Sequence, residues 1–276
     1  MSAEGRPARV LPLRGLAGPW AIVALLLGVG GLQGCASGPS LAQLPAEELY
    51  ARGQAEFEEE DWGDAAELLD RLLLAHPTFP DAPAARLMLA RAYFNDEKYL
   101  TAHQEYQRFV DRNRGHPGAP EAALGMCRSY AELSPIPERD QDYTERALTT
   151  CQRVVQDYAG IEDEVADEAS EITNRMRHKL AQSLYQDGSF YYDREWWDSA
   201  IIYFEFVVED YADTVWAPRA MDRIIEVYQE LGYREEVAEW RRRLQDSYPD
   251  SPEARAHREG GGAAADTSAV DATGIR

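Results

Sequence analysis

The feature that most constrains the fold is a set of small, aromatic and apolar residues that recurs along the chain with fixed offsets. Its first copy places them at Gly53, Trp62, Ala65, Leu69, Leu72 and Pro77. The small residues allow two helices to approach closely, while the aromatic and leucine side chains fill the groove between them. Proline ends the second helix because it cannot continue one. The pattern therefore predicts a helix–turn–helix unit that stacks on copies of itself.

Four further copies keep these offsets imperfectly. They place the pattern at Ala90, Tyr99, Ala102, Tyr106 and Phe109; at Gly125, Ala147, Cys151 and Val154; at Trp197, Ala200, Phe204 and Val207; and, loosely, from Val237 to Pro249. A loop over 134–140 interrupts the third copy, and a long first helix, near 163–194, opens the fourth. The offsets resemble the tetratricopeptide repeat. We therefore predict an all-α, tetratricopeptide-like helical solenoid of about five helix-turn-helix repeats over residues 47–257, with unrelated helical hairpins as the alternative.

The N-terminal segment is typical of a lipoprotein signal peptide. Arginines precede an apolar run, Trp20 to Leu32, which is too short to span a bilayer comfortably but suits a signal sequence. The run ends in Leu32-Gln33-Gly34-Cys35, which resembles the lipobox. We predict a signal peptide over 1–34, lipidation of Cys35 and an acylated tether over 35–46. A short membrane anchor with an incidental cysteine is the alternative. The Gly- and Ala-rich end, 258–276, predicts a disordered tail.

Composition and missing motifs exclude several function classes. The formal net charge of -21 argues against a nucleic-acid partner, because phosphate binding needs clustered cations. The five histidines lack metal-ligand spacing, and acidic runs such as Glu58-Glu59-Glu60-Asp61 lack EF-hand spacing. Phosphate loops and nucleophile elbows are missing as well. We therefore expect no metal, no cofactor and no enzyme activity.

Two cysteines remain after Cys35, and the sequence leaves their state open. Cys127 and Cys151 stand at core positions of the third repeat. They could form a disulfide in an oxidising compartment. We favour two separately buried small residues on packed helices, because the sequence alone does not show that their geometry permits a bond.

With the lipobox, tether and repeats in this order, the chain resembles the BamD family of lipoproteins of the β-barrel assembly machinery. The resemblance rests on Glu48-Leu49-Tyr50 with Gly53, on ARAYFNDEKYLTAHQEYQRFV (residues 90–110) with His116-Pro117 after it, and on Tyr191-Tyr192-Asp193-Arg194 before Trp196-Trp197 and VVEDYADT (residues 207–214). It implies a scaffold, lipid-anchored to the outer membrane and facing the periplasm, for assembly and insertion of outer-membrane proteins. The implied partners are the POTRA region of a BamA-like insertase, other Bam lipoproteins and unfolded outer-membrane proteins. A pilotin, or a coordinator of the cell envelope during division, is the alternative function.

The family binds unfolded substrates through its N-terminal repeats. We expect the concave face to come mainly from first helices, and we place substrate-peptide binding at Tyr50, Gln54, Phe57, Arg91 and Phe94. Arg91 would bind a C-terminal carboxylate or backbone carbonyls, and the aromatic residues would supply contact area. The alternative for Phe57 and Phe94 is packing between helices.

The family contacts the insertase through its C-terminal repeats. We predict partner-protein binding at Trp196 and Tyr203, because each neighbours a core residue and so points elsewhere, and because exposed Trp and Tyr are common anchors of interfaces. The alternative for Trp196 is packing against the fifth repeat. The region Ala200 to Tyr203 lacks the basic residue that the family can present to the insertase.

Overall fold

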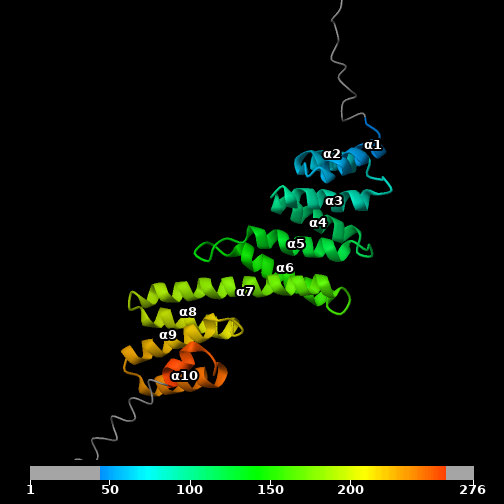
Figure 1. Cartoon of the computed structure of the whole chain (residues 1–276). Helices are drawn as coiled ribbons and strands as arrows, with labels where there is room; N and C mark the ends of the chain where they lie inside the picture. Colours follow the sequence, from blue (N-terminus) through cyan, green and yellow to red (C-terminus); the bar gives the residue numbers. More distant parts are fainter. Residues whose placement is uncertain (1–43, 259–276) are drawn as a thin grey trace, which may run out of the picture. The chain divides into compact units, whose positions relative to one another are not determined.

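The computed structural model describes residues 44–258 as α-helices and connecting turns, with no strand in that range. The helices are α1 (Ala46–Glu58), α2 (Trp62–Ala75), α3 (Ala82–Asn95), α4 (Tyr99–Arg112), α5 (Ala119–Leu133), α6 (Asp142–Tyr158), α7 (Asp163–Tyr192), α8 (Trp197–Asp210), α9 (Trp216–Glu230) and α10 (Arg234–Ser247), and residues 252–258 form a last short helix (Figure 1). The predicted all-α class is confirmed. The signal peptide and Cys35, most of the tether and nearly all of the tail lie outside the described residues.

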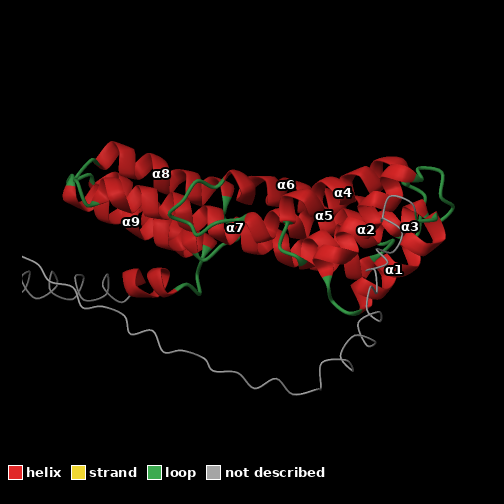
Figure 2. Ribbon diagram, turned by 90° about the horizontal axis from the view of Figure 1, so that it is seen from above, coloured by secondary structure: helices red, strands yellow, loops and turns green. Residues whose placement is uncertain are grey.

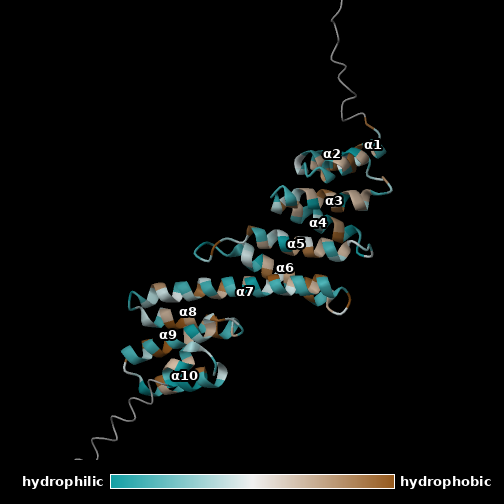
Figure 3. Ribbon diagram, in the orientation of Figure 1, coloured by the Kyte–Doolittle hydropathy of each residue, from teal (hydrophilic) through white to brown (hydrophobic). Residues whose placement is uncertain are grey.

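The helices stack in sequence order as five antiparallel pairs, from α1–α2 to α9–α10. Each helix packs chiefly against the helices just before and after it in the chain, which is the contact pattern of a solenoid. Seen from above, α4, α6 and α8 lie along one side and α7 and α9 along the other (Figure 2). Hydrophobic residues gather where helices meet, most clearly between α8 and α9 (Figure 3). In the described part of the chain, no helix combines the length and apolar character needed to cross a membrane.

The turn inside a repeat recurs with the same backbone conformation and confirms the repeat register. A residue with positive φ stands two positions before the second helix in four repeats: Glu60, Glu97, Glu195 and Gly232. The next residue donates its backbone N–H to the carbonyl five positions back, as from Trp196 to Tyr191 at 3.0 Å. This is the long-range hydrogen bond of a Schellman motif, which satisfies a carbonyl at the end of the first helix.

Small residues stand at close contacts between neighbouring helices in the first four repeats, as the pattern predicts. Ala65, Ala102, Ala147 and Ala200 are all fully buried. Glycine is required at two further positions because a ring covers it: a Cβ on Gly125 would lie 2.5 Å from the Tyr106 ring, and one on Gly188 would lie 2.7 Å from the Phe204 ring. These contacts fix how closely α5 approaches α4 and how closely α7 approaches α8.

Helix α7 joins two repeats. It has 30 residues, and it packs on α5 and α6 as well as on α8 and α9. The third-repeat loop lies along α7: Lys179 Nζ donates to Ser134 Oγ at 2.7 Å, and Ser183 Oγ donates to the Pro137 carbonyl at 2.8 Å. The predicted interruption is therefore an ordered segment that is bonded to α7.

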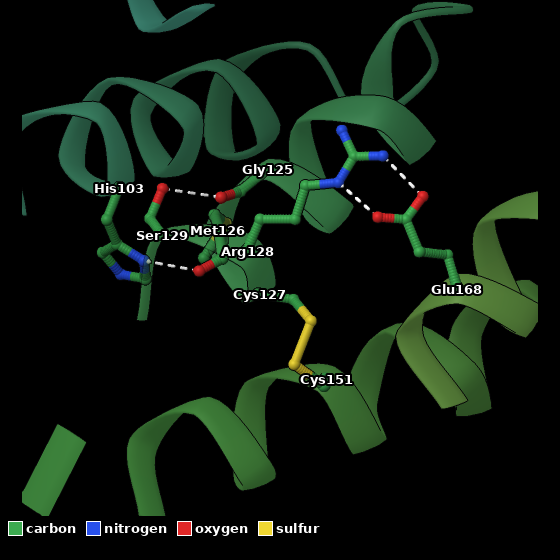
Figure 4. The surroundings of a disulfide bond; sticks show 8 residues. All are labelled: His103, Gly125, Met126, Cys127, Arg128, Ser129, Cys151 and Glu168. Atoms are coloured by element: carbon green, nitrogen blue, oxygen red, sulfur yellow. Dashed lines mark hydrogen bonds and ion pairs between the residues drawn. A yellow bond between two sulfur atoms is a disulfide. The ribbon is translucent and has the colours of Figure 1, made fainter. Parts of the chain in front are cut away.

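The preference for unpaired cysteines is wrong. Cys127 on α5 and Cys151 on α6 form a disulfide, with their Cα atoms 4.9 Å apart (Figure 4). Both are fully buried, as expected for core positions of packed helices. The repeat pattern placed each residue correctly in the core, but it did not show that the two positions face each other across the α5–α6 contact.

Candidate functional site

Within residues 44–258, exposed aromatic side chains gather on the fourth repeat. We call Phe190, Tyr191, Trp196, Tyr203 and Phe206 the aromatic surface. Trp196 is 56% exposed, Phe190 48% and Phe206 45%, while the two tyrosines are half-buried. Large apolar residues that stay exposed in one place mark interaction sites in soluble domains.

The rings form a connected set. Tyr191 stands at the centre: its ring stacks on Tyr203 with centroids 5.2 Å apart and lies 5.8 Å from Trp196. Phe190 meets Tyr191 edge-on at 5.4 Å, and Phe206 meets Tyr203 edge-on at 6.3 Å. Tyr191 packs against the buried core of the last two repeats, and Tyr203 stacks on Tyr191. The two tyrosines therefore support the three exposed rings.

The α7–α8 turn positions this surface. Phe190 and Tyr191 belong to the last turn of α7, Trp196 is the residue before α8, and Tyr203 and Phe206 follow on α8. Trp197 packs edge-on against Tyr192 at 5.4 Å, so it is occupied within the repeat. The side chains of the two adjacent tryptophans therefore point in different directions. Trp197 packs within the repeat, and Trp196 is exposed to solvent.

Charged groups surround the aromatic surface. The Arg194 guanidinium lies 3.5 Å from the Phe190 ring centroid, and its Nη1 donates to the Phe190 carbonyl at 2.8 Å. Burial raises the pKa of the Asp187 carboxyl one turn before Tyr191, and burial with Glu209 nearby raises the pKa of Glu205. A hydrogen bond with Tyr191 raises the pKa of Tyr203. The surface therefore offers one cation and several acids around neutral rings.

The residues predicted to bind substrate peptides are spread over the first two repeats. Phe57 packs edge-on against Trp62 at 4.9 Å, and Phe94 packs in the same way against Tyr99 at 5.3 Å. Both are half-buried, and each packs against the aromatic residue that begins the second helix of its own repeat. This geometry favours the packing alternative for Phe57 and Phe94.

Tyr50 and Gln54 lie one turn apart on α1, and both are half-buried. The Tyr50 ring meets Phe79, at the start of the second repeat, with centroids 5.4 Å apart. Burial, with Asp81 nearby, raises the pKa of Tyr50. Of the five predicted substrate residues, Gln54 is the one whose side chain forms no hydrogen bond, ion pair or ring contact within the described residues, so it is best placed to report on a ligand.

Arg91 belongs to a ladder of ion pairs between first helices. It binds Glu121 on α5 through both Nε and Nη2, and Arg128 on α5 binds Glu168 on α7 in the same bidentate way (Figure 4). Hydrogen bonding to Arg128 lowers the pKa of Glu168. Because Glu121 already binds the Arg91 guanidinium, a ligand carboxylate would have to displace Glu121.

Three carboxylates gather at the first turn. Oxygens of Glu56, Asp61 and Asp64 lie within 4.8 Å of one another. Asp61 and Asp64 are exposed, and water solvates them there. Acidic groups are frequent on a chain with 49 Asp and Glu residues, so we assign no ligand to this cluster.

Sequence reasoning missed three members of the aromatic surface. Phe190, Tyr191 and Phe206 sit at helix positions that the repeat pattern leaves free, and the template does not report whether such positions face solvent. A signal was nevertheless present, because bulky aromatics outside the template positions crowd around a single turn. Trp196 and Tyr203 do lie together, joined through Tyr191.

The comparison with known families decides the assignment. Residues 42–244, which include α1 to α9 and most of α10, match the YfiO family, described as outer membrane lipoprotein. The chain belongs to this family. Both predicted binding regions fall within the stretch that matches the YfiO family.

Individual relatives agree with the YfiO match. The chain is 28% identical over 236 residues to the outer membrane protein assembly factor BamD of Caulobacter vibrioides, which covers 85% of this chain and 74% of that protein. It is 24% identical to the protein of the same name from Vibrio cholerae, over 80% of this chain and 95% of that one. BamD of Rickettsia prowazekii is 25% identical over 83% and 90%. The resemblance to the BamD family is thereby confirmed.

Proposed function

We propose that this chain is an outer-membrane lipoprotein that serves as a non-catalytic scaffold for the assembly and insertion of outer-membrane proteins. In this proposal Cys35 carries the lipid anchor and the domain faces the periplasm. The aromatic surface binds the POTRA region of a BamA-like insertase, other Bam lipoproteins join the complex, and the first two repeats receive unfolded outer-membrane proteins.

One observation carries the proposal: a member of the YfiO family exposes a connected aromatic surface on its fourth repeat. Aromatic residues are enriched among the few residues that dominate binding energy. The rings are held by the fold before a partner arrives, which reduces the entropy lost on binding. The acids around them would speed association with a basic partner surface and make it sensitive to salt.

Replacing Trp196 and Phe206 together with alanine should weaken binding to the insertase at least 30-fold, because truncating one anchor of an interface costs ~2 kcal/mol or more. Binding is measured by calorimetry with the purified POTRA region of the insertase from the same organism. Both side chains are about half exposed, so the melting temperature should stay nearly unchanged.

Leu74→Ala is the matched control, since Leu74 is 82% exposed on α2, far along the sequence from the aromatic surface. It should leave binding unchanged. If the double variant folds normally and binds as tightly as this control, the aromatic surface is not the contact with the insertase.

Cys35→Ser should release the protein from the membrane or leave its signal peptide uncleaved, because serine lacks the thiol that accepts the lipid. Two or three acyl chains give durable anchoring, at ~0.8 kcal/mol per buried methylene. Fractionation of the envelope, with labelling by a radioactive fatty acid, measures both effects. Unaltered membrane attachment and label in the serine variant would contradict acylation at this residue.

A photocrosslinker at Gln54 should capture unfolded outer-membrane proteins, because this side chain on α1 is only half-buried and forms no hydrogen bond or ring contact within the described residues. A denatured, radiolabelled outer-membrane protein is added to the purified chain, and the crosslinked product is identified on a gel. The same crosslinker at Ile161, which is 74% exposed in the α6–α7 turn, is the control. Equal yield at both positions would contradict a substrate site in the first two repeats.

A further inference from the structure

A groove of about 740 Å³ opens between α4 and α6, with α5 as its floor. Its size lies in the range of ligand-binding pockets. The aromatic surface does not contribute to it. Its lining consists of His103, Gln107, Val110 and Asp111 from α4, Arg114 from the α4–α5 connection, Ala119, Ala123, Met126 and Tyr130 from α5, and Thr150, Arg153, Val154, Asp157 and Tyr158 from α6. We call it the α4–α6 groove.

The walls and the floor differ in character. Along α4 the lining residues His103, Gln107 and the pair Val110 and Asp111 are three or four positions apart, so they form one helical face about 12 Å long. The floor is apolar apart from the Tyr130 hydroxyl. A narrow apolar floor between two polar helical walls matches the way grooves receive an amphipathic helix.

His103 provides the groove with a hydrogen-bond acceptor. It is 6% exposed, and its Nδ1 lies 3.3 Å from the Met126 carbonyl, which can only accept a hydrogen bond (Figure 4). Nδ1 therefore carries the proton, and Nε2 is left as an acceptor on the opposite side of the ring. Among the described residues Nε2 has no hydrogen-bond partner. Burial lowers the pKa of His103, with Arg146 acting in the same direction, so the ring stays neutral at neutral pH.

The disulfide makes the groove a preformed site. Cys127 follows the floor residue Met126, and Cys151 follows the wall residue Thr150. The bond therefore joins floor and wall covalently inside the third repeat. On the other side, the His103 ring packs against the Tyr130 ring with centroids 3.9 Å apart and ties α4 to α5. A site held in this way loses little conformational entropy when it is filled.

The charge of the α4–α6 groove differs from that of the rest of the chain. Its lining includes two arginines, Arg114 and Arg153, and two aspartates, Asp111 and Asp157, so it is neutral on a protein of net charge -21. Neither arginine forms an ion pair within the described residues. The groove therefore tolerates a mildly acidic ligand, which the acidic surface elsewhere would repel, as well as a neutral one.

The backbone chemistry of the walls selects the conformation of the ligand. All three helices use their internal N–H and C=O groups within themselves, so they offer no edge to an extended peptide. A helix satisfies its own backbone groups and needs only side-chain contacts. An extended segment would leave its backbone groups unpaired over an apolar floor.

We propose that the α4–α6 groove binds an amphipathic α-helix of a partner protein. The bound part of the helix is about two turns long and neutral or mildly acidic. It places an apolar stripe on the floor residues Ala123 and Met126, and a hydrogen-bond donor faces Nε2 of His103. This site is separate from the aromatic surface and does not depend on the proposed contact with the insertase.

The test uses a phage-displayed library of 16-residue peptides selected on the purified mature chain. Enriched peptides should carry apolar residues at positions i, i+3 or i+4, and i+7. Their affinity should fall at least tenfold for Ala123→Glu, which puts a charge on the floor, and for Thr150→Glu on the opposite wall. Ala51→Glu, at an exposed position of α1, is the matched control and should leave affinity unchanged. Circular dichroism confirms that each variant is folded.

Three results would overturn the proposal. The first is no enrichment over beads without protein. The second is enriched peptides that bind Ala123→Glu and Thr150→Glu as tightly as the unaltered chain, which would place their site elsewhere. The third is a selected pattern that alternates every second residue, which would indicate an extended ligand.

His103→Phe should lower the affinity of peptides with a donor facing Nε2 about tenfold and leave the affinity of peptides without such a donor unchanged. Equal loss for both classes would overturn the role of His103.

Discussion

Replacing Cys127 and Cys151 with alanine should lower the free energy of unfolding by about 3.5 kcal/mol. The bond closes a loop with a sequence separation of 24, and the chain-entropy model gives about that value for a loop of this length. The loop includes the third-repeat segment that lies along α7, so its loss should also loosen that segment. Urea denaturation followed by circular dichroism measures the change.

The single variants Cys127→Ala and Cys151→Ala separate the bond from the packing of the sulfur atoms. Each keeps one buried sulfur and lacks the cross-link, so each should lose nearly as much stability as the double variant. If each lost only about half, the effect would come from the cavities left by the sulfurs.

Gly188→Ala should destabilise the protein by ~1–3 kcal/mol, although alanine is the better helix former by ~1 kcal/mol. The new Cβ would lie 2.7 Å from the Phe204 ring, which is fully buried and has no room to withdraw. Helices α7 and α8 would have to separate, and the aromatic surface that they carry would be displaced. Thermal unfolding measures the loss.

Gly63→Ala is the opposite control. Gly63 lies in α2 with no atom within 4 Å of the position of an added Cβ. Only helix propensity acts there, so this variant should be more stable than the unaltered chain by up to ~1 kcal/mol. If the two substitutions changed stability in the same direction, close packing would not be the reason for glycine at position 188.

The repeat fold follows from the sequence because close helix contact demands small residues at fixed offsets. Ala65 and Ala102 are buried where the pattern puts them, and the long helix expected near 163–194 is α7, Asp163–Tyr192. The disulfide could not be derived in this way. It depends on the rotation of α5 relative to α6, which the period of the repeat does not determine.

The candidate sites were only partly predictable for the same reason. The template indicates which face of a helix is buried, and from this Trp196 and Tyr203 follow as outward-facing residues. The template does not indicate which side chains of a neighbouring repeat or turn contact a given residue. Arg91 is paired because α5 supplies Glu121, 30 positions later in the chain. Phe57 is covered because the α1–α2 turn places the Trp62 ring against it. The α4–α6 groove likewise appears only when three helices from two repeats are assembled.

The continuity of α7 has a mechanical consequence. A helix of 30 residues is about 45 Å long, and a helix without a break transmits rotation along its whole length. One end of this rod carries the α7–α8 turn, and the other packs on α6, the wall that the disulfide holds. We therefore expect the third and fourth repeats to turn together as one rigid body, and we expect bending of the solenoid at the junctions where successive repeats meet through separate helices.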